Sequence, residues 1–146
     1  SSAASDVYKR QAQRHNTRLA LLFLDVNDFK GINDVHGHAV GDRVLCVIAR
    51  RLERCVRDSD LVARMGGDEF TVLLTDVQSH ETVSAKVAQI LAAMAEPLGA
   101  EFGSVKMPSC SVGVAFYPAD GADADTLLSH ADSDMYRIKR LRLAAE

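Results

Sequence analysis

The chain has 146 residues, of which 47% are hydrophobic and 25% charged, so it can bury a core and fold as one globular domain. Its formal net charge of −3 argues against a general nucleic-acid-binding protein, which usually carries an excess of Lys and Arg. No apolar run reaches the roughly 18–20 residues of a membrane span, and no signal-like leader opens the chain. We therefore expect a cytoplasmic protein with no membrane segment in this fragment.

Residues 1–11 are mostly small and polar and show no periodicity that fits a core element. We expect them to be a non-native or disordered leader. One domain is predicted at residues 12–146, truncated at its N-terminus.

An apolar run at residues 19–24 ends at Asp25 and predicts a buried β-strand. Residues 31–41 are rich in Gly, Asn, His and Asp, which favours a mixture of turn and short helix. Residues 40–56 place apolar side chains at three- and four-residue intervals, with arginines mostly on the opposite side. This pattern predicts an amphipathic helix.

Gly66 and Gly67 separate two short apolar segments, residues 61–64 and 70–74, which predicts a β-hairpin whose turn tolerates positive φ. Ser79 is suited to cap a helix that continues to about Met94 and stops before Pro97. The side chains expected on the inner face of this helix are Val83, Val87, Ile90, Leu91 and Met94.

Residues 110–116 form the last predicted strand, and a last helix is expected to begin at Asp125. The order strand, helix, hairpin, helix, strand, helix is that of a βαββαβ sheet. It predicts an α+β fold of ferredoxin-like or polymerase-palm type, with the helices on one face of the sheet.

Three acids stand at the ends of predicted strands. Asp25 ends the first strand, and Asp68 and Glu69 follow the Gly-Gly turn. If the two strands are neighbours, these carboxylates form an oxygen-rich site of the kind that Mg²⁺ and a nucleoside triphosphate need. The alternative is that they are ordinary strand-end and turn carboxylates exposed to solvent.

In order and spacing, the chain from about Leu19 to Lys139 resembles the GGDEF family of diguanylate cyclases. The segments that carry the resemblance are residues 23–30 (FLDVNDFK), 32–34 (IND), 37–42 (GHAVGD), 60–64 (DLVAR), 66–70 (GGDEF), 111–115 (SVGVA), and Ala131-Asp132 with Met135-Tyr136 and Lys139.

The chain also departs from the family pattern. The family's DxLTxLxNR stretch ahead of the first strand is absent, and Asn27 stands where many members have Asp. Leu143 occupies the position of a phosphate-binding arginine, for which Arg140 or Arg142 is a candidate substitute.

The resemblance implies an enzyme that condenses two GTP molecules into cyclic di-GMP and two pyrophosphates, acting as a homodimer in which each copy binds one GTP. It implies that Asp25, the carbonyl of Val26 and Asp68 hold Mg²⁺, with Mn²⁺ as an alternative ion. It further implies that Asp68 and Glu69 are catalytic, Glu69 assisting with a second ion or with the attacking hydroxyl.

For the substrate, the resemblance assigns guanine recognition to Asn33 and Asp42, since one amide and one carboxylate satisfy the donors and acceptors of the base. It assigns the phosphates to Lys139, and Lys30 follows a corner where backbone N–H groups open toward a helix start. The alternative is that Asn33 and Asp42 are turn residues beside glycines and that both lysines are simply exposed.

Arg57 and Asp60 match the family's RxxD inhibitory site, which binds the cyclic product. The resemblance therefore implies product inhibition. A helix-end ion pair between the two side chains is the alternative interpretation.

Two other functions fit the same residues. One is a catalytically silent GGDEF module that binds GTP or cyclic di-GMP and regulates an attached phosphodiesterase (EAL) domain. The C-terminal departure favours this interpretation, whereas the intact Gly-Gly-Asp-Glu-Phe segment opposes it. The other is a cyclase or polymerase that uses a different nucleotide.

Overall fold

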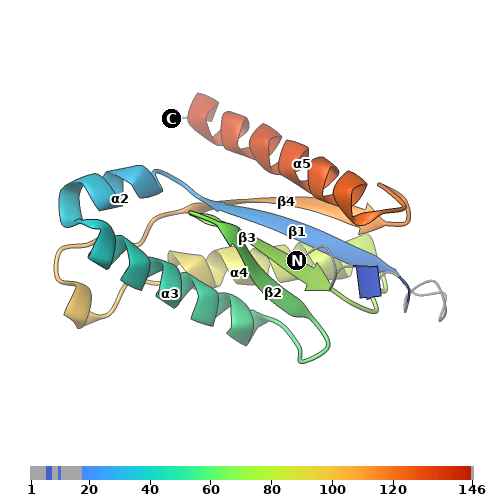
Figure 1. Cartoon of the computed structure of the whole chain (residues 1–146), viewed down its shortest axis with the longest axis horizontal. Coiled ribbons are helices and arrows are strands. Elements are labelled where there is room, and N and C mark those ends of the chain that lie inside the picture. The colour runs from blue at the N-terminus through green and yellow to red at the C-terminus, as the bar shows by residue number, and fades with distance from the viewer. Residues whose placement is uncertain (1–5, 8–9, 11–17, 146) are drawn as a thin grey trace.

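The computed structural model describes residues 6–7, 10 and 18–145, and its body is one antiparallel sheet flanked by helices (Figure 1). The expectation for the leader falls mostly outside these residues. The elements in chain order are β1 Leu19–Val26, α2 Phe29–His36, α3 His38–Cys55, β2 Leu61–Gly66, β3 Glu69–Leu74, α4 His80–Ala95, the 3₁₀ helix η1 Ala100–Phe102, β4 Cys110–Tyr117 and α5 Ala124–Ala145. In this part of the chain, no helix combines the length and the apolar character needed to cross a membrane.

The sheet has the strand order β2-β3-β1-β4, so the first strand of the sequence lies inside the sheet. All eight residues of β1 are buried, as the apolar run predicts. At its C-terminal end, Asp25 lies opposite Glu69 of β3 on one side and Ser111 of β4 on the other.

The two faces of β1 belong to two different cores. The even-numbered side chains from Ala20 to Val26 pack with α3 and α4, whereas the odd-numbered ones from Leu19 to Phe23 pack with α5. Figure 1 shows α5 on one side of the sheet and α3 and α4 on the other. The α+β fold is confirmed, but the expectation that the helices share one face is wrong. A strand that is apolar on both faces must be covered on both.

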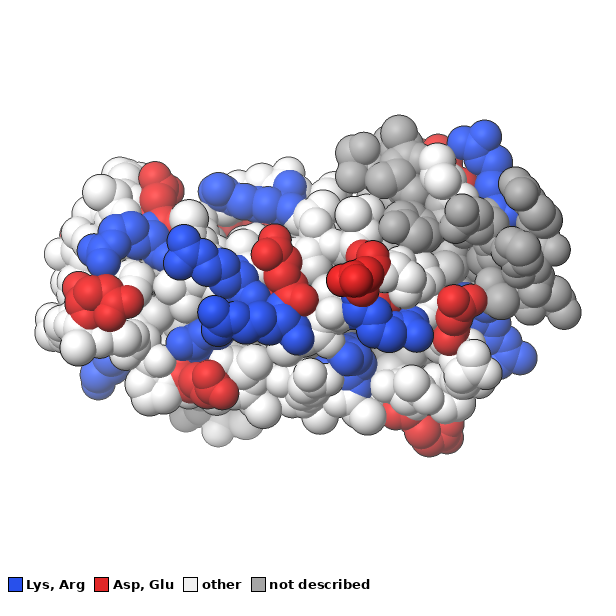
Figure 2. All heavy atoms as spheres, turned by 90° about the horizontal axis from the view of Figure 1, so that it is seen from below, with Lys and Arg blue, Asp and Glu red and all other residues white. Residues whose placement is uncertain are grey.

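Residues 31–41, expected to be half turn and half short helix, lie almost entirely in two helices. Helix α2 ends at His36 and α3 begins at His38. The amphipathic character of α3 is confirmed: Val44, Ile48 and Leu52 are fully buried. Three arginines of α3, Arg43, Arg50 and Arg54, are exposed, whereas Arg51 is half-buried. Figure 2 looks onto this side of the molecule, where basic side chains form a band among acidic ones.

Helix α4 begins as predicted, since the Ser79 hydroxyl accepts a hydrogen bond from the backbone N–H of Thr82 at 3.1 Å. One predicted inward residue is wrong, because Leu91 is 39% exposed. Helix α4 buries only a narrow stripe of side chains that includes Val83 and Ile90. Successive residues of a helix are rotated by about 100°, so the side chain of Leu91, the residue after Ile90, points away from this stripe.

Helix α5 lies directly on β4 because Gly113 has no side chain. A Cβ atom at this position would lie 2.1 Å from the carbonyl oxygen of Ala131 and 2.1 Å from the nitrogen of Met135. This close approach sets the height of α5 above the sheet, and it brings the second half of the helix over the end of β1.

Candidate active site

Asp25 is the last residue of β1 whose side chain lies on the face of the strand that α5 covers. Strand alternation points its side chain toward α5, where Lys139 Nζ donates to Asp25 Oδ2 at 2.6 Å. The Asp25 side chain is only 13% exposed, so the lysine supplies the opposite charge that a buried carboxylate needs.

The tip of the β2–β3 hairpin is held beside the end of β1. Gly66 and Gly67 have φ values of 153° and 45°, which confirms the turn predicted from the glycine pair. Arg64 Nε donates to the carbonyl oxygen of Gly67 at 2.9 Å, and the backbone N–H of Val26 donates to the carbonyl oxygen of Asp68 at 3.1 Å. The turn that carries Asp68 is thereby fixed to the strand end that carries Asp25.

The carboxylates of Asp25, Asp68 and Glu69 lie close enough to act on one another. Burial raises the pKa of Asp68, and the charge of Asp25 together with a side-chain hydrogen bond to it raises this pKa further. Burial also raises the pKa of Glu69, followed by the charges of Asp25, Asp68 and Asp132. Lys139 opposes both shifts. The structure thus gathers the three acids that the sequence singled out.

The cluster offers the oxygen ligands that Mg²⁺ prefers, but only a partial set of them. Within the described ranges, no group of three or more His, Cys, Asp or Glu side chains is arranged to hold a metal ion by itself. Mg²⁺ in nucleotide-binding sites usually takes one or two carboxylates and completes its six ligands with phosphate oxygens and water. Asp25, Asp68 and the adjacent Val26 carbonyl fit a site of that kind.

Asn33 lies on α2 against the first turn of α3. Its Oδ1 atom is buried and accepts no hydrogen bond from any described residue, and a Cβ at Gly41 would be 1.8 Å from it. Asp42, the residue after Gly41, is exposed. The two residues predicted to bind guanine therefore lie on two facing helices, Asn33 on α2 and Asp42 on α3, and Gly41 is the point where the helices approach each other.

Lys30 lies at the start of α2 and is largely exposed. Its Nζ donates to Asp34 Oδ2 at 2.8 Å, one helical turn along, and this pairing raises the pKa of the lysine. An exposed pair of this type contributes little to stability, so Lys30 can exchange Asp34 for an anionic ligand at little cost.

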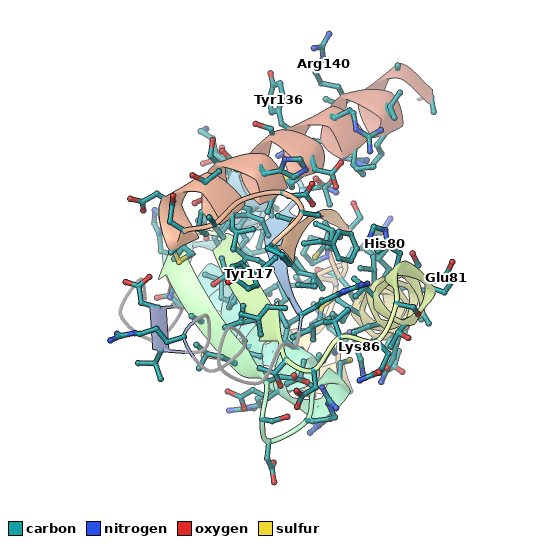
Figure 3. The ribbon with its side chains drawn as sticks, turned by 90° about the vertical axis from the view of Figure 1, so that its right-hand side faces the viewer. His80, Glu81, Lys86, Tyr117, Tyr136 and Arg140 are labelled. Atoms are coloured by element: carbon teal, nitrogen blue, oxygen red, sulfur yellow. The ribbon has the colours of Figure 1, made fainter. Side chains whose placement is uncertain are left out.

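The two candidate substitute arginines on α5 lie on different sides of the helix. Arg142 lines an open groove of about 580 Å³ together with Asn27 and Asp28 at the corner between β1 and α2. Arg140 lines a separate surface pocket with Tyr136, and Figure 3 shows both projecting from α5 away from the sheet. Only Arg142 therefore lies beside the corner that leads from Asp25 to Lys30.

A family model described as diguanylate cyclase, GGDEF domain, matches residues 3–142. The chain belongs to the GGDEF family. Because the matched range begins within residues 1–11, the domain boundary at residue 12 stays a prediction.

Two curated relatives place this GGDEF domain among longer proteins. The diguanylate cyclase TpbB of Pseudomonas aeruginosa is 44% identical over 131 residues, which are 90% of this chain and 30% of that protein. MucR of the same species, a bifunctional diguanylate cyclase/cyclic di-GMP phosphodiesterase, is 37% identical over 130 residues, 89% of this chain and 19% of that protein. The chain spans less than a third of the length of these relatives.

Solved structures agree with the fold. The crystal structure of the GGDEF domain of TpbB is 43% identical and superposes with a TM-score of 0.87, covering 92% of this chain and 83% of that one. The GGDEF domain of DgcB from Caulobacter crescentus, in complex with c-di-GMP, is 26% identical with a TM-score of 0.81, covering 94% of this chain and 83% of that one.

In this GGDEF domain, Arg57 and Asp60 form the ion pair that was the alternative interpretation of the RxxD segment. Asp60 Oδ2 accepts from the backbone N–H of Arg57 at 2.9 Å, and Oδ1 accepts from the backbone N–H of Thr75 at 2.9 Å. Burial alone would raise the pKa of Asp60, but hydrogen bonds from Thr75 and Arg57 outweigh it and lower that pKa. Both carboxylate oxygens of Asp60 therefore accept hydrogen bonds within the fold, whereas the Arg57 side chain is 58% exposed.

Sequence reasoning gave little weight to Asn27, which is buried at the β1–α2 corner. Its partners Ser109 and Ser111 lie 82 and 84 residues away in the chain, so no spacing in the sequence signals the contact. Gly113 does carry a signal in the sequence. A glycine in a strand interior often marks a close backbone approach, here the contact with α5.

Proposed function

We propose that this GGDEF domain is a diguanylate cyclase that condenses two GTP molecules into cyclic di-GMP. The observation that carries the proposal is the convergence of Asp25, Asp68 and Glu69 under α5, with Lys139 as their cationic neighbour. Membership of the family and the likeness to TpbB support it. Because GTP is a cytoplasmic nucleotide, we place the domain in the cytoplasm.

Asp25, Asp68 and the Val26 carbonyl would hold Mg²⁺ or Mn²⁺. The ion would neutralise charge on the triphosphate and on the pyrophosphate leaving group. Glu69, whose pKa is raised, would lie near the attacking hydroxyl or a second ion. The raised pKa values suit groups that exchange a proton or a cation during each turnover.

Asn33 and Asp42 would recognise guanine. The unsatisfied Asn33 Oδ1 supports this assignment, because a buried acceptor without a partner costs about 1–3 kcal/mol, and pairing the reoriented amide with the base would relieve that cost. Lys30, Lys139 and Arg142 would bind the phosphates, Arg142 replacing the arginine that is absent at Leu143.

Each domain would hold one GTP, and a second copy would face it. The 3′-oxygen of one GTP attacks the α-phosphorus of the other, the bond to the β-phosphate oxygen breaks, pyrophosphate leaves, and the hydroxyl proton passes to a base. The same step in the opposite direction closes the ring. The protein contributes placement and charge neutralisation rather than a covalent intermediate.

The deciding experiment incubates the purified protein with GTP and Mg²⁺ and measures cyclic di-GMP and pyrophosphate. We expect product from the wild type, a loss of at least about 10²-fold in Asp68→Ala, and an initial rate that rises more steeply than linearly with protein concentration. A strictly linear rate from a monomer would contradict the two-copy mechanism. Competition with ATP tests whether another nucleotide is the substrate.

Product inhibition is proposed through Arg57. Its half-exposed guanidinium borders a pocket of about 310 Å³ that Lys86 and Gln78 also line, a basic and polar setting suited to a phosphodiester. Asp60 would act by holding Arg57 in place rather than by contacting the product.

The second candidate function is a silent module that binds GTP or cyclic di-GMP and regulates an attached phosphodiesterase domain. The name of MucR, a cyclase that is also a phosphodiesterase, supports the attached phosphodiesterase domain, and the replacement of the family arginine by Leu143 supports the loss of catalysis. Retained GTP binding without any cyclic product would support this candidate over the cyclase.

A further inference from the structure

The corner between β1 and α2 is held by a buried polar cluster centred on Asn27. This side chain is 3% exposed. Its Nδ2 donates to the hydroxyl of Ser109 at 3.0 Å, and the hydroxyl of Ser111 donates to its Oδ1 at 3.0 Å. The backbone N–H of Asn27 adds a bond to the carbonyl oxygen of Ser109 at 2.8 Å. One residue thus joins the corner to the start of β4 by three hydrogen bonds.

The residues on either side of Asn27 show why this corner matters. Val26 presents the carbonyl proposed for the metal, and its N–H is bound by the hairpin tip through the Asp68 carbonyl at 3.1 Å. Asp28 has a φ of 52°, in the left-handed region that most non-glycine residues avoid and that Asp adopts more readily than most. The corner is therefore fixed by the hairpin on one side and by β4, through Asn27, on the other.

We infer that Asn27 is a positioning residue: it orients the Val26 carbonyl and the phosphate-binding corner through Ser109 and Ser111, and it contacts neither metal nor nucleotide. This inference rests on the proposed function. Asn27 borders the groove beside Arg142, but it is only 3% exposed and both functional groups of its amide are already bonded to serines.

The amide also has a consequence for charge. It forms the cluster without adding a fourth carboxylate beside Asp25, Asp68 and Glu69, where burial and then the neighbouring negative charges already raise the pKa values of Asp68 and Glu69. Hydrogen-bonded partners of this kind orient metal ligands, and their loss typically lowers metal affinity or activity 10- to 100-fold.

Ser111 provides the sharpest test, because it is 2% exposed and its hydroxyl, the part that the alanine variant removes, is bonded to Asn27. We expect Ser111→Ala and Asn27→Ala to weaken binding of 3′-deoxy-GTP with Mg²⁺ by about ten-fold or more and to lower kcat more than they raise KM. Asn27→Asp can accept hydrogen bonds from both serine hydroxyls, so it should retain more activity than Asn27→Ala.

Ser79→Ala is the matched control, because it removes a serine hydroxyl that caps α4 far along the chain from this corner. It should lower the unfolding midpoint but leave binding and kcat at the wild-type level. Wild-type binding and kcat in Ser111→Ala and Asn27→Ala, or losses no larger than in Ser79→Ala, would overturn the inference. A wild type that binds 3′-deoxy-GTP but forms no cyclic di-GMP would refute the proposed function, and the binding measurements would still decide the role of Asn27. Absence of binding in the wild type would overturn both.

Discussion

At the scale of single residues, Lys139 has two candidate partners, the Asp25 carboxylate and the phosphates of the nucleotide. The family resemblance assigns it to the phosphates, and the structure pairs its Nζ with Asp25 Oδ2 at 2.6 Å, on the carboxylate proposed to hold the metal. If Asp25 holds the ion as proposed, a cation and this lysine would compete for the same oxygen. Binding of Mg²⁺ and GTP would move Lys139 from Asp25 to the phosphates.

This competition makes an unusual prediction. We expect Lys139→Met to tighten Mg²⁺ binding without nucleotide by about three- to ten-fold, because Asp25 loses its counter-charge, while GTP turnover falls. Isothermal titration with Mg²⁺ or Mn²⁺ measures the first effect. Lys30→Met is the control, since the exposed pair of Lys30 with Asp34 does not involve the acids at the strand ends. Weaker ion binding in Lys139→Met would exclude the competition.

The two arginines of α5 give a second residue-scale prediction. Arg142→Ala should raise the KM for GTP by about ten-fold, because one charge-assisted contact to phosphate contributes on the order of 1.5–3 kcal/mol. Arg140→Ala should have little effect, because Arg140 projects away from the sheet (Figure 3). Steady-state kinetics of the two variants decide between them, and the reverse order of effects would reject Arg142.

At the scale of elements, the site depends on how closely α5 approaches β4. We expect Gly113→Ala to destabilise the fold by about 1–3 kcal/mol, because the new methyl group would meet the backbone of α5 and not a flexible side chain. Displacement of α5 should also separate Lys139 from Asp25. Gly99→Ala is the matched control, because a Cβ there meets only the carboxylate end of Glu101. Urea unfolding measures the stability, and equal midpoints for the two variants would contradict this account.

The connection between α3 and β2 makes the second element-scale prediction. Asp60 accepts hydrogen bonds from the backbone N–H groups of Arg57 and Thr75, so Asp60→Ala should cost about 2 kcal/mol or more in urea unfolding. Arg57→Ala should cost less stability but relieve inhibition by cyclic di-GMP. Unchanged inhibition in a folded Arg57→Ala variant would mean that the pocket beside Arg57 does not bind the product.

At the scale of the whole molecule, the fold holds mutually repelling acids together between the sheet and α5. Asp68 and Glu69 have pKa values above their ordinary 3.8 and 4.5, because burial and neighbouring charge disfavour ionisation. The folded chain therefore binds these protons more tightly than the unfolded chain. The contribution of these groups to the free energy of unfolding falls as the pH rises through their folded-state pKa values.

A divalent cation should reverse this loss, because it favours the ionised acids. We expect Mg²⁺ to raise the unfolding midpoint more at about pH 8 than at about pH 5, where protons compete for the carboxylates. Thermal unfolding with and without MgCl₂ at the two pH values measures the effect, and Asp68→Asn should reduce it. An equal or larger Mg²⁺ effect at acid pH would contradict the assignment of these acids to the ion.

Much of this protein follows from local sequence patterns. The helix periods, the Ser79 cap and the Gly66-Gly67 turn predicted their elements because each depends on residues within one or two turns of the chain. The ordered segments around Asp25 and residues 66–70 were enough to indicate the family. Positions defined by short-range chemistry were therefore found from the sequence.

Contacts across the sheet were decided only by the tertiary structure. Nothing local indicates that α5 covers the opposite face from α3, that Lys139 pairs with Asp25, or that Asn27 reaches Ser109 and Ser111. These partners are more than 80 residues apart, and their contacts depend on strand register and on the closeness that Gly113 permits. The sequence by itself determined which residues carry the chemistry, whereas packing of distant segments determined which of them meet.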